Sequence, residues 1–257
     1  PIAPQRSERS LLDDITIDYG PPDLLGRLFL KAEAQARLAG VRLEFAPFER
    51  LIEVNRSHKQ NWRPLLPLFQ PDLGGIGPDN GFCILGYNAQ GEVVATQAAR
   101  LYTWTNTNFK AEAESLRLFY SDPERSKQEG ETCRVTARSA EDIVGRIAFS
   151  GAVWYRPDYR AHGLSSCITR ISKALAHTRW YTDVTLSIMA EDVVNQGMAR
   201  RVGYSNVEYE VMLTNSPVGT VRTALIWMRP PEMFEHLDSY LRRVDPEIDR
   251  IVHDRTA

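Results

Sequence analysis

Hydrophobic residues alternate with small or polar residues from Ile143 to Tyr155, which predicts a long β-strand. One predicted face carries Ile147, Phe149, Val153 and Tyr155, and the other carries Ala148, Ser150, Ala152 and Trp154. Gly151 interrupts this alternation. An isolated glycine inside a strand indicates a bulge, or a close approach by another backbone or a ligand.

After this strand the chain turns through Pro157 and Gly163 and continues as an amphipathic helix. Its hydrophobic residues recur every three or four positions and comprise Leu164, Cys167, Ile168, Ile171, Ala174 and Leu175. We expect Ser166, Arg170 and Lys173 to face solvent. The pattern therefore predicts a strand, a turn and a helix in immediate succession.

The rest of the chain also alternates between strand and helix patterns. Further strands are predicted over 41–45, 82–87, 92–102, 183–189, 207–214 and 221–228. Further helices are predicted after Pro22, over 47–58, 111–120 and 191–202, and from Pro230 onward. The segment 64–80 is rich in proline and glycine, which predicts a loop. Such a loop beside a site often shapes a substrate pocket, although a plain surface connection is commoner.

The turn before the helix at Leu164 has the features of an anion site. The first N–H groups of a helix have no partner within the helix and carry the positive end of its dipole, so they bind phosphate through the backbone. Gly163 and Ser165 are small enough to let a pyrophosphate reach the main chain. An ordinary strand-turn-helix crossover explains the same pattern equally well.

The order of these elements resembles the GNAT N-acetyltransferase superfamily, whose signature is roughly V-x-P-x-Y-R-G-x-G-L-G, followed by N-x-x-A and an aliphatic-x-G-F ending. Residues 155–165 align with the first part without a gap, and Asp192, Asn195 and 202–204 align with the second. The match covers 143 to about 213 well, extends less closely over 82–142 and is weak at both ends. It implies an α/β (α+β) fold: a mixed, mostly antiparallel central sheet flanked by helices, with extra N- and C-terminal helices.

The resemblance implies that acetyl-CoA is the acyl donor and that the protein holds it mainly through the main chain. The implied contacts are Val153, Trp154 and Tyr155 along the pantetheine arm, then Arg160, Ala161, His162, Gly163, Leu164, Ser165 and Ser166 at the pyrophosphate. Asn195 is a further implied contact to the arm. A solvated or capping amide is an equally good interpretation of Asn195.

Several positions depart from the family pattern. Ser165 replaces a Gly or Ala, and Asp192 stands where many members have Asn. Ala199 occupies the position of the Tyr that many members use to protonate the thiolate, and Phe149 occupies that of a Glu base. Neither catalytic role transfers, so the catalytic residues stay unassigned. Tyr204, His162 and Tyr155 are weak candidates for moving protons.

The composition and charge of the chain limit the kinds of partner that it is expected to bind. A net charge of -2, from 31 basic and 33 acidic residues, disfavours nucleic-acid binding. No run of eighteen apolar residues and no signal-peptide core at 1–6 occur, which predicts no membrane association. Cys83, Cys133 and Cys167 are odd in number and far apart, which predicts reduced thiols, a cytoplasmic location and no bound metal.

We divide the chain into an N-terminal helical extension (1–40), a GNAT-like domain (41–230) and a C-terminal helix packed on that domain (231–257). The apolar side of this last helix is expected to pack within the chain, or else in a homodimer. The acceptor pocket is expected to come from about 46–80 and 104–132, which do not specify a ligand.

Three functions follow. The first is acetyl transfer to a primary amine of a small molecule or peptide, by direct attack. The second is non-catalytic acyl-CoA binding or sensing. The third is nucleotide binding by an unrelated α/β protein, which is less favoured because no G-x-G-x-x-G or G-K-[ST] follows a strand.

Overall fold

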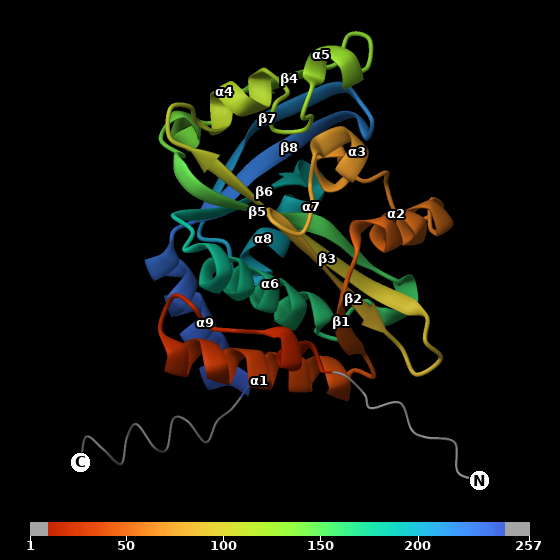
Figure 1. The fold of residues 1–257 in the computed structure, drawn as a ribbon, viewed down its shortest axis with the longest axis vertical. Coiled ribbons are helices and arrows are strands. Elements are labelled where there is room, and N and C mark those ends of the chain that lie inside the picture. Colours follow the sequence, from red (N-terminus) through yellow and green to blue (C-terminus); the bar gives the residue numbers. More distant parts are fainter. Residues whose placement is uncertain (1–9, 245–257) are drawn as a thin grey trace.

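The computed structural model describes residues 10–244, which form one eight-stranded mixed sheet with helices on both faces (Figure 1). The strand order is β1-β2-β3-β5-β6-β8-β7-β4, and β5–β6 is parallel whereas the other neighbours are antiparallel. The strands are β1 (Arg42–Ala46), β2 (Gly81–Tyr87), β3 (Val93–Trp104), β4 (Thr132–Val135), β5 (Gly145–Tyr155), β6 (Val184–Ala190), β7 (Asn206–Ser216) and β8 (Gly219–Met228). The predicted mixed, mostly antiparallel sheet is confirmed.

One face of the sheet is covered by α6 (Leu164–Trp180), with α1 (Pro22–Leu38) and α9 (Pro230–Val244) outside it (Figure 1). The short helices α7 (Glu191–Asn195) and α8 (Met198–Arg201) lie on the same face. The other face carries α2 (Phe48–Ser57), η2 (Pro67–Phe69), α3 (Pro71–Gly74) and α4 (Phe109–Glu114). The chain also contains η1 (Leu11–Asp14), α5 (Pro123–Ser126), η3 (Arg138–Glu141) and η4 (Pro157–Tyr159). The sheet thus separates two apolar cores.

Helix α6 lies in the middle of its layer, and this corrects one prediction. Its predicted apolar side is buried, but Arg170 and Lys173, expected to face solvent, are only 3% and 2% exposed. Arg170 lies over the ring of Tyr240 on α9, and Lys173 lies over the ring of Tyr204. The prediction was wrong because α1 and α9 cover the side of α6 that a surface helix would present to water.

Other predicted elements differ in their limits. The helix expected over 191–202 is divided by Gly197 at φ +79°, where the backbone is left-handed. The helix expected over 111–120 is the shorter α4, and the loop 64–80 contains η2 and α3. Strand β4 was not predicted, because its four residues are too few to show a pattern.

The C-terminal helix α9 packs on α1 within the chain, where Met233, Leu237, Tyr240 and Leu241 are buried. The division of the chain into three parts stays a prediction, and the calls on 1–9 and 245–257 concern residues outside the described range. Cys83, Cys133 and Cys167 are free and buried. Burial raises the pKa of the Cys167 thiol to about 11, as expected of a packing residue.

Candidate functional site

The parallel strands β5 and β6 separate partway along their length. They pair only where Ile147, Ala148 and Phe149 lie beside Val184, Thr185 and Leu186. From Ser150 onward, no strand within residues 10–244 pairs with β5 on its β6 side, while β6 stays paired with β8 as far as Ala190. A gap therefore opens in the middle of the sheet and leaves one edge of β5 without a partner.

A bulge in β5 lies at this gap. Ala98 pairs with Gly151 and Thr96 with Trp154, so β5 has one more residue than β3 between these pairs, and Ala152 has φ +51°. The extra residue reverses the alternation of faces. Trp154 consequently joins Phe149 in one core, and Tyr155 packs against the other. The prediction that Phe149 and Tyr155 share a face was therefore wrong, although Gly151 correctly marked the irregularity.

The gap opens into a cavity of about 520 Å³ that reaches both faces of the sheet. On the α6 face, which we call the helix side, its apolar lining comprises Tyr155, Met189, Met198, Val202, Tyr204 and Ile226. On the opposite face, the loop side, the apolar lining comprises Trp62, Leu65, Leu66, Phe69, Phe149, Trp154, Ile188, Leu213 and Val218. A volume of this size is typical of small-molecule sites.

The turn before α6 lies at the helix side of the cavity. Gly163 has φ +79° and caps α6, and a Cβ placed there would meet nothing within 4 Å. Ala161 also has a left-handed backbone, at φ +65°. The peptide N–H groups from Ala161 to Ser165 donate to no other group of residues 10–244. The turn that the sequence predicts to bind an anion therefore has a row of N–H groups with no partner in the described part of the chain, at a helix N-terminus.

The other predicted contact residues divide into two groups. Val153, Trp154, Tyr155, Arg160 and Ser165 line the cavity. Ala161, His162 and Gly163 are exposed on the turn, Leu164 is buried in the core, and the Ser166 hydroxyl accepts a hydrogen bond from Arg170. Asn195 is exposed on α7 and is not part of the lining, to which α7 contributes Asp192 and Val193. The structure thus does not bring Asn195 to the cavity.

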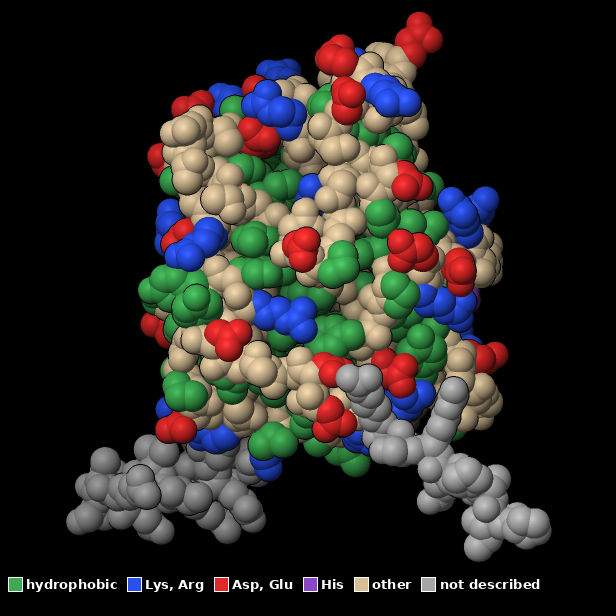
Figure 2. All heavy atoms as spheres, viewed as in Figure 1, with side chains coloured by type: hydrophobic (Ala, Val, Ile, Leu, Met, Phe, Trp, Pro, Cys, Tyr) green, Lys and Arg blue, Asp and Glu red, His purple; other side chains and the backbone are tan. Residues whose placement is uncertain are grey.

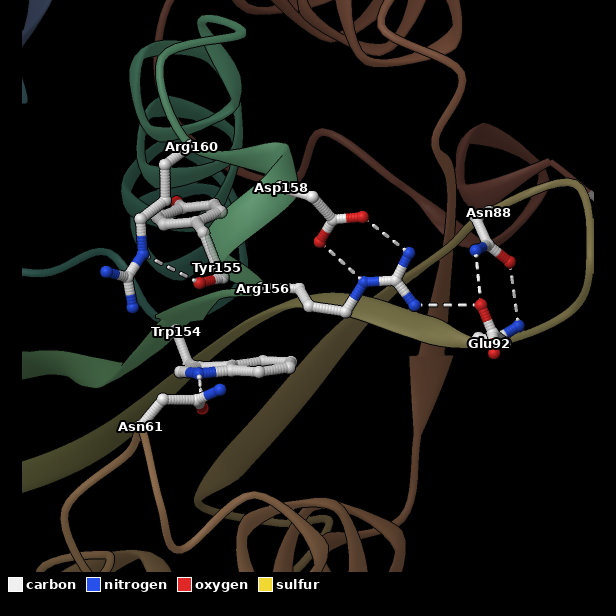
Figure 3. A network of polar contacts seen from close by, with 8 residues as sticks. All are labelled: Asn61, Asn88, Glu92, Trp154, Tyr155, Arg156, Asp158 and Arg160. Carbon is white, nitrogen blue, oxygen red and sulfur yellow. Dashed lines mark hydrogen bonds and ion pairs between the residues drawn. The ribbon is translucent and has the colours of Figure 1, made fainter.

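A network of charged groups holds the turn in place (Figure 3). Arg156 donates to both carboxylate oxygens of Asp158, each at 2.8 Å, and to Glu92 at 2.8 Å on the β2–β3 turn. These hydrogen bonds, with Asp158 first, raise the pKa of Arg156, and they lower the pKa values of both carboxyls. Arg160 Nε donates to the Tyr155 carbonyl at 3.2 Å. The part of the turn next to β5 is therefore held by side-chain hydrogen bonds.

The family's two catalytic positions hold apolar side chains that do not titrate. Phe149 is 1% exposed and packs edge-on against Phe69, with ring centroids 6.0 Å apart. Ala199 is 2% exposed within α8. Among the weak candidates, His162 is exposed on the turn, whereas Tyr155 and Tyr204 line the cavity. Burial raises the pKa of both tyrosines, so both stay protonated at neutral pH.

Tyr204 belongs to a short polar chain in the cavity lining. A hydrogen bond with Ser150 opposes the effect of burial on the Tyr204 pKa. Ser150 Oγ in turn accepts from Gln97 Nε2 at 2.9 Å. Gln97 Nε2 also donates to the Gly151 carbonyl at 3.3 Å, whereas Gln97 Oε1 is buried and has no partner in the described part of the chain. The sequence analysis did not single out Gln97, which sits in an ordinary strand pattern.

The loop side only partly follows the predicted pocket segments. Residues 61–66 and Phe69 line the cavity, as expected for the proline-rich segment. The fully described segment 104–132 contributes none of the lining, whereas β7 and β8 contribute Leu213, Val218, Val221 and Thr223. The β7–β8 contribution could not be read from the sequence, because it depends on the curvature of the sheet.

Charges of both signs are mixed on the face of the molecule drawn in Figure 2. Figure 2 shows acidic and basic side chains interspersed on the face viewed, with hydrophobic side chains across its middle. No helix within residues 10–244 combines the length and the apolar character needed to cross a bilayer. In the same residues, no three His, Cys, Asp or Glu side chains come together as a metal site.

Searches against protein-family models and against curated proteins return no match. Among solved structures, the chain is similar to NAA60 of Arabidopsis thaliana in complex with acetyl-CoA (13% identity, 74% of this chain and 99% of that chain, TM-score 0.40). It is also similar to a spermidine N-acetyltransferase of Vibrio cholerae in complex with CoA and spermine (9%, 76% and 98%, TM-score 0.41). A third is an uncharacterized protein of Bacillus halodurans (9%, 79% and 91%, TM-score 0.46).

These structures thus include a protein in complex with acetyl-CoA and a spermidine N-acetyltransferase. Because each TM-score is below 0.5, we base the assignment that follows on the cavity and the peptide groups of this chain.

Proposed function

We propose that this chain is a GNAT-type N-acyltransferase that transfers an acetyl group from acetyl-CoA to a primary amine. The observation that carries the proposal is the row of free N–H groups from Ala161 to Ser165, beside a β5 edge that has no partner from Ser150 onward. A diphosphate and a peptide-like arm need these two features together. The first N–H groups of any uncapped helix are free, so the unpaired edge of β5 beside them is the feature that an ordinary crossover does not need.

The residues present fit the donor. The N–H groups of the turn hold the diphosphate, and the side chain of Arg160, exposed beside them, adds a positive charge. The edge of β5 from Val153 to Tyr155 has no described strand beside it, and its Tyr155 carbonyl accepts from Arg160 Nε; this edge pairs with the amides of the pantetheine arm as an added strand does. The thioester then lies at the gap, near the bulge. Asn195 is left out of this assignment, because it does not line the cavity.

Acetyl-CoA supplies an activated acyl group, since its thiol leaves easily. In the transfer, the amine nitrogen forms a bond to the carbonyl carbon as the carbon–sulfur bond breaks, and the proton lost by nitrogen ends on sulfur. The Tyr204 hydroxyl, kept protonated by burial, donates a hydrogen bond toward the sulfur. Positioning by the cavity supplies the remaining rate enhancement, because Phe149 and Ala199 cannot act as base or acid.

The test is binding followed by turnover. Isothermal titration calorimetry should show saturable binding of acetyl-CoA, with desulfo-CoA competing and ATP or NAD not competing. The protein is then incubated with acetyl-CoA and a panel of amines. Mass spectrometry should detect an amine product about 42 Da heavier, because an acetyl group replaces a hydrogen. Binding of ATP or NAD with no affinity for CoA would favour the unrelated nucleotide-binding function instead.

A specific observation favours non-catalytic acyl-CoA binding as the second candidate. Both positions at which the family places its titrating residues are apolar and buried here. This function predicts the same calorimetric binding of acetyl-CoA with no product from any amine. A Tyr204→Phe variant separates the two functions, because it lowers kcat in an enzyme and leaves the acetyl-CoA affinity of a sensor unchanged.

A further inference from the structure

We propose that the acceptor is a primary amine carried on an aromatic or branched aliphatic group, and not a polyamine or another dication. This inference rests on the proposed function and names the acceptor class of the same site. It depends on the lining of the loop side, on the charges around the cavity, and on one buried amide.

The loop side presents two aromatic pairs to the cavity. Trp62 stacks on Trp154, with centroids 5.3 Å apart and an interplanar angle of 14°. Phe69 meets Phe149 edge-on. Trp154 Nε1 donates to Asn61 Oδ1 at 3.1 Å, so the indole is satisfied and presents an apolar surface (Figure 3). Such a wall recognises an apolar group by area and shape.

The charges of the lining disfavour a second ammonium. The charged side chains that line the cavity, in the described part of the chain, are Arg63, Arg160 and Asp192. Arg160 and Asp192 belong to the turn and to α7, so the loop side carries Arg63 and no carboxylate. A dication would leave an unpaired charge against apolar groups, which is strongly unfavourable. An amine with an apolar body meets no such penalty.

One buried amide provides the polar contact for the amine. Gln97 Nε2 is committed to Ser150 Oγ and the Gly151 carbonyl, which fixes the orientation of the amide. Gln97 Oε1 is left without a partner, and the residue is 0% exposed. A buried acceptor without a donor is costly, and the N–H of a bound amine would satisfy it.

The apolar wall also explains how the amine can react without a general base at position 149. A primary amine with a pKa of about 10.4 is mostly protonated in neutral water. Transfer into an apolar cavity lowers the pKa of the amine, because burial disfavours its charged form. The loop side therefore selects the neutral nucleophile without a titrating side chain at Phe149.

The first experiment compares amines on the whole protein. Calorimetry of acetyl-CoA alone is done first, and no binding at all overturns the proposed function and this inference together. With the protein saturated with CoA, 2-phenylethylamine or tryptamine should bind at least 10-fold more tightly than spermidine or putrescine. With acetyl-CoA, the same order should appear in kcat/KM. Acetyl-CoA binding with equal or greater preference for polyamines overturns this inference alone.

The second experiment changes the wall. Leu66 is half-buried and lines the loop side, so Leu66→Asp places a carboxylate where a second ammonium would lie. We expect the ratio of kcat/KM for spermidine over 2-phenylethylamine to rise at least 10-fold. Leu66→Asn, of the same size but uncharged, should leave the ratio within 3-fold. An unchanged ratio in Leu66→Asp would contradict the inference. Faster turnover of octanoyl-CoA than of acetyl-CoA would also contradict it, because the apolar wall would then bind the acyl chain of the donor.

A third variant tests the amide. Gln97→Met keeps the length of the side chain and removes the acceptor, so the affinity of CoA-loaded protein for 2-phenylethylamine should fall about 10-fold while the Kd of acetyl-CoA stays within 2-fold. A change in the Kd of acetyl-CoA with unchanged amine affinity would contradict this role. Circular dichroism at the working temperature shows whether the variant is folded.

Discussion

The helix side and the loop side of the cavity are built in different ways. The proposed donor-binding groups of the helix side come from one short segment, in which β5, the turn and the start of α6 follow one another within 150–166. These groups are peptide N–H groups, which every residue except proline provides. The loop side combines side chains from residues 61–69, β5, β6, β7 and the β7–β8 turn. Backbone recognition can therefore persist while the acceptor wall changes, and the two sides can be disrupted separately.

The largest effect is expected from Gly163→Glu, which places bulk and negative charge among the free N–H groups. We expect the Kd of acetyl-CoA, measured by calorimetry, to rise more than 100-fold. Gly40→Glu is a matched control, since Gly40 also has a left-handed backbone, at φ +73°, with nothing within 4 Å of an added Cβ. Both variants should lose similar stability, about 1–2 kcal/mol. Equal acetyl-CoA affinity in the two would contradict the assignment of the turn.

A change on the loop side should weaken the binding of the amine and leave the binding of acetyl-CoA unchanged. Arg100 is 9% exposed and donates to the Leu68 carbonyl at 2.9 Å, which holds the segment that carries Phe69. In Arg100→Met we expect the KM of the amine to rise about 5-fold, because the wall loosens when a buried carbonyl loses its donor. Calorimetry should show the Kd of acetyl-CoA within 2-fold. The control is Arg134→Met, on the exposed side of β4.

If Arg100→Met weakened acetyl-CoA and amine equally, the two sides would not be separable, and the comparison above would fail.

The buried side chain of Lys173, which contacts the helix-side residue Tyr204, should make the stability of the protein depend on pH. Burial, and then the charge of Arg170, lower the pKa of Lys173 well below its ordinary value. The unfolded chain therefore binds one more proton than the folded chain between the lowered pKa and about 10.4, so stability rises with pH in that window. Urea unfolding at pH 7 and pH 9.5 should show this rise.

In Lys173→Met the part of the slope due to this residue should vanish, a loss of up to about 3 kcal/mol between the two pH values for one full proton. A wild-type slope that persists unchanged in Lys173→Met would show that the buried amine is not its source.

The smallest effect is expected at Ala161, which adopts φ +65° without being glycine. Ala161→Gly removes the unfavourable contact of Cβ in this conformation and should raise the free energy of unfolding by up to about 1 kcal/mol. The Kd of acetyl-CoA should stay within 2-fold, because the N–H groups keep their places. A lower thermal midpoint for Ala161→Gly would indicate that this alanine contributes more through its methyl group than through its backbone.

Patterns that are local in the sequence predicted most strands and helices and the turn at the helix side, whereas the mixed sheet was implied by the resemblance to the GNAT superfamily. Gly163 marks the cap of α6, Gly151 marks the irregularity in β5, and the alternation over 183–189 gives β6. The same reasoning failed where local pattern is insufficient. It could not show that the bulge places Tyr155 on the face opposite Phe149, since one added residue leaves the composition of the strand unchanged. It also placed Arg170 in solvent, because the cover provided by α9 comes from a distant part of the chain.

The sequence alone determined most strands and helices and the uncapped helix N-terminus after Gly163, because hydrophobic period and turn chemistry act over a few neighbouring residues. The arrangement of the strands in a mixed sheet was implied by the resemblance to a known family. Tertiary structure decided the separation of β5 from β6 and the burial of Gln97 and Lys173. It also brought β7 and β8 to the wall of the cavity. These features depend on which distant segments pack together, and packing between distant segments leaves no periodic signal in either one.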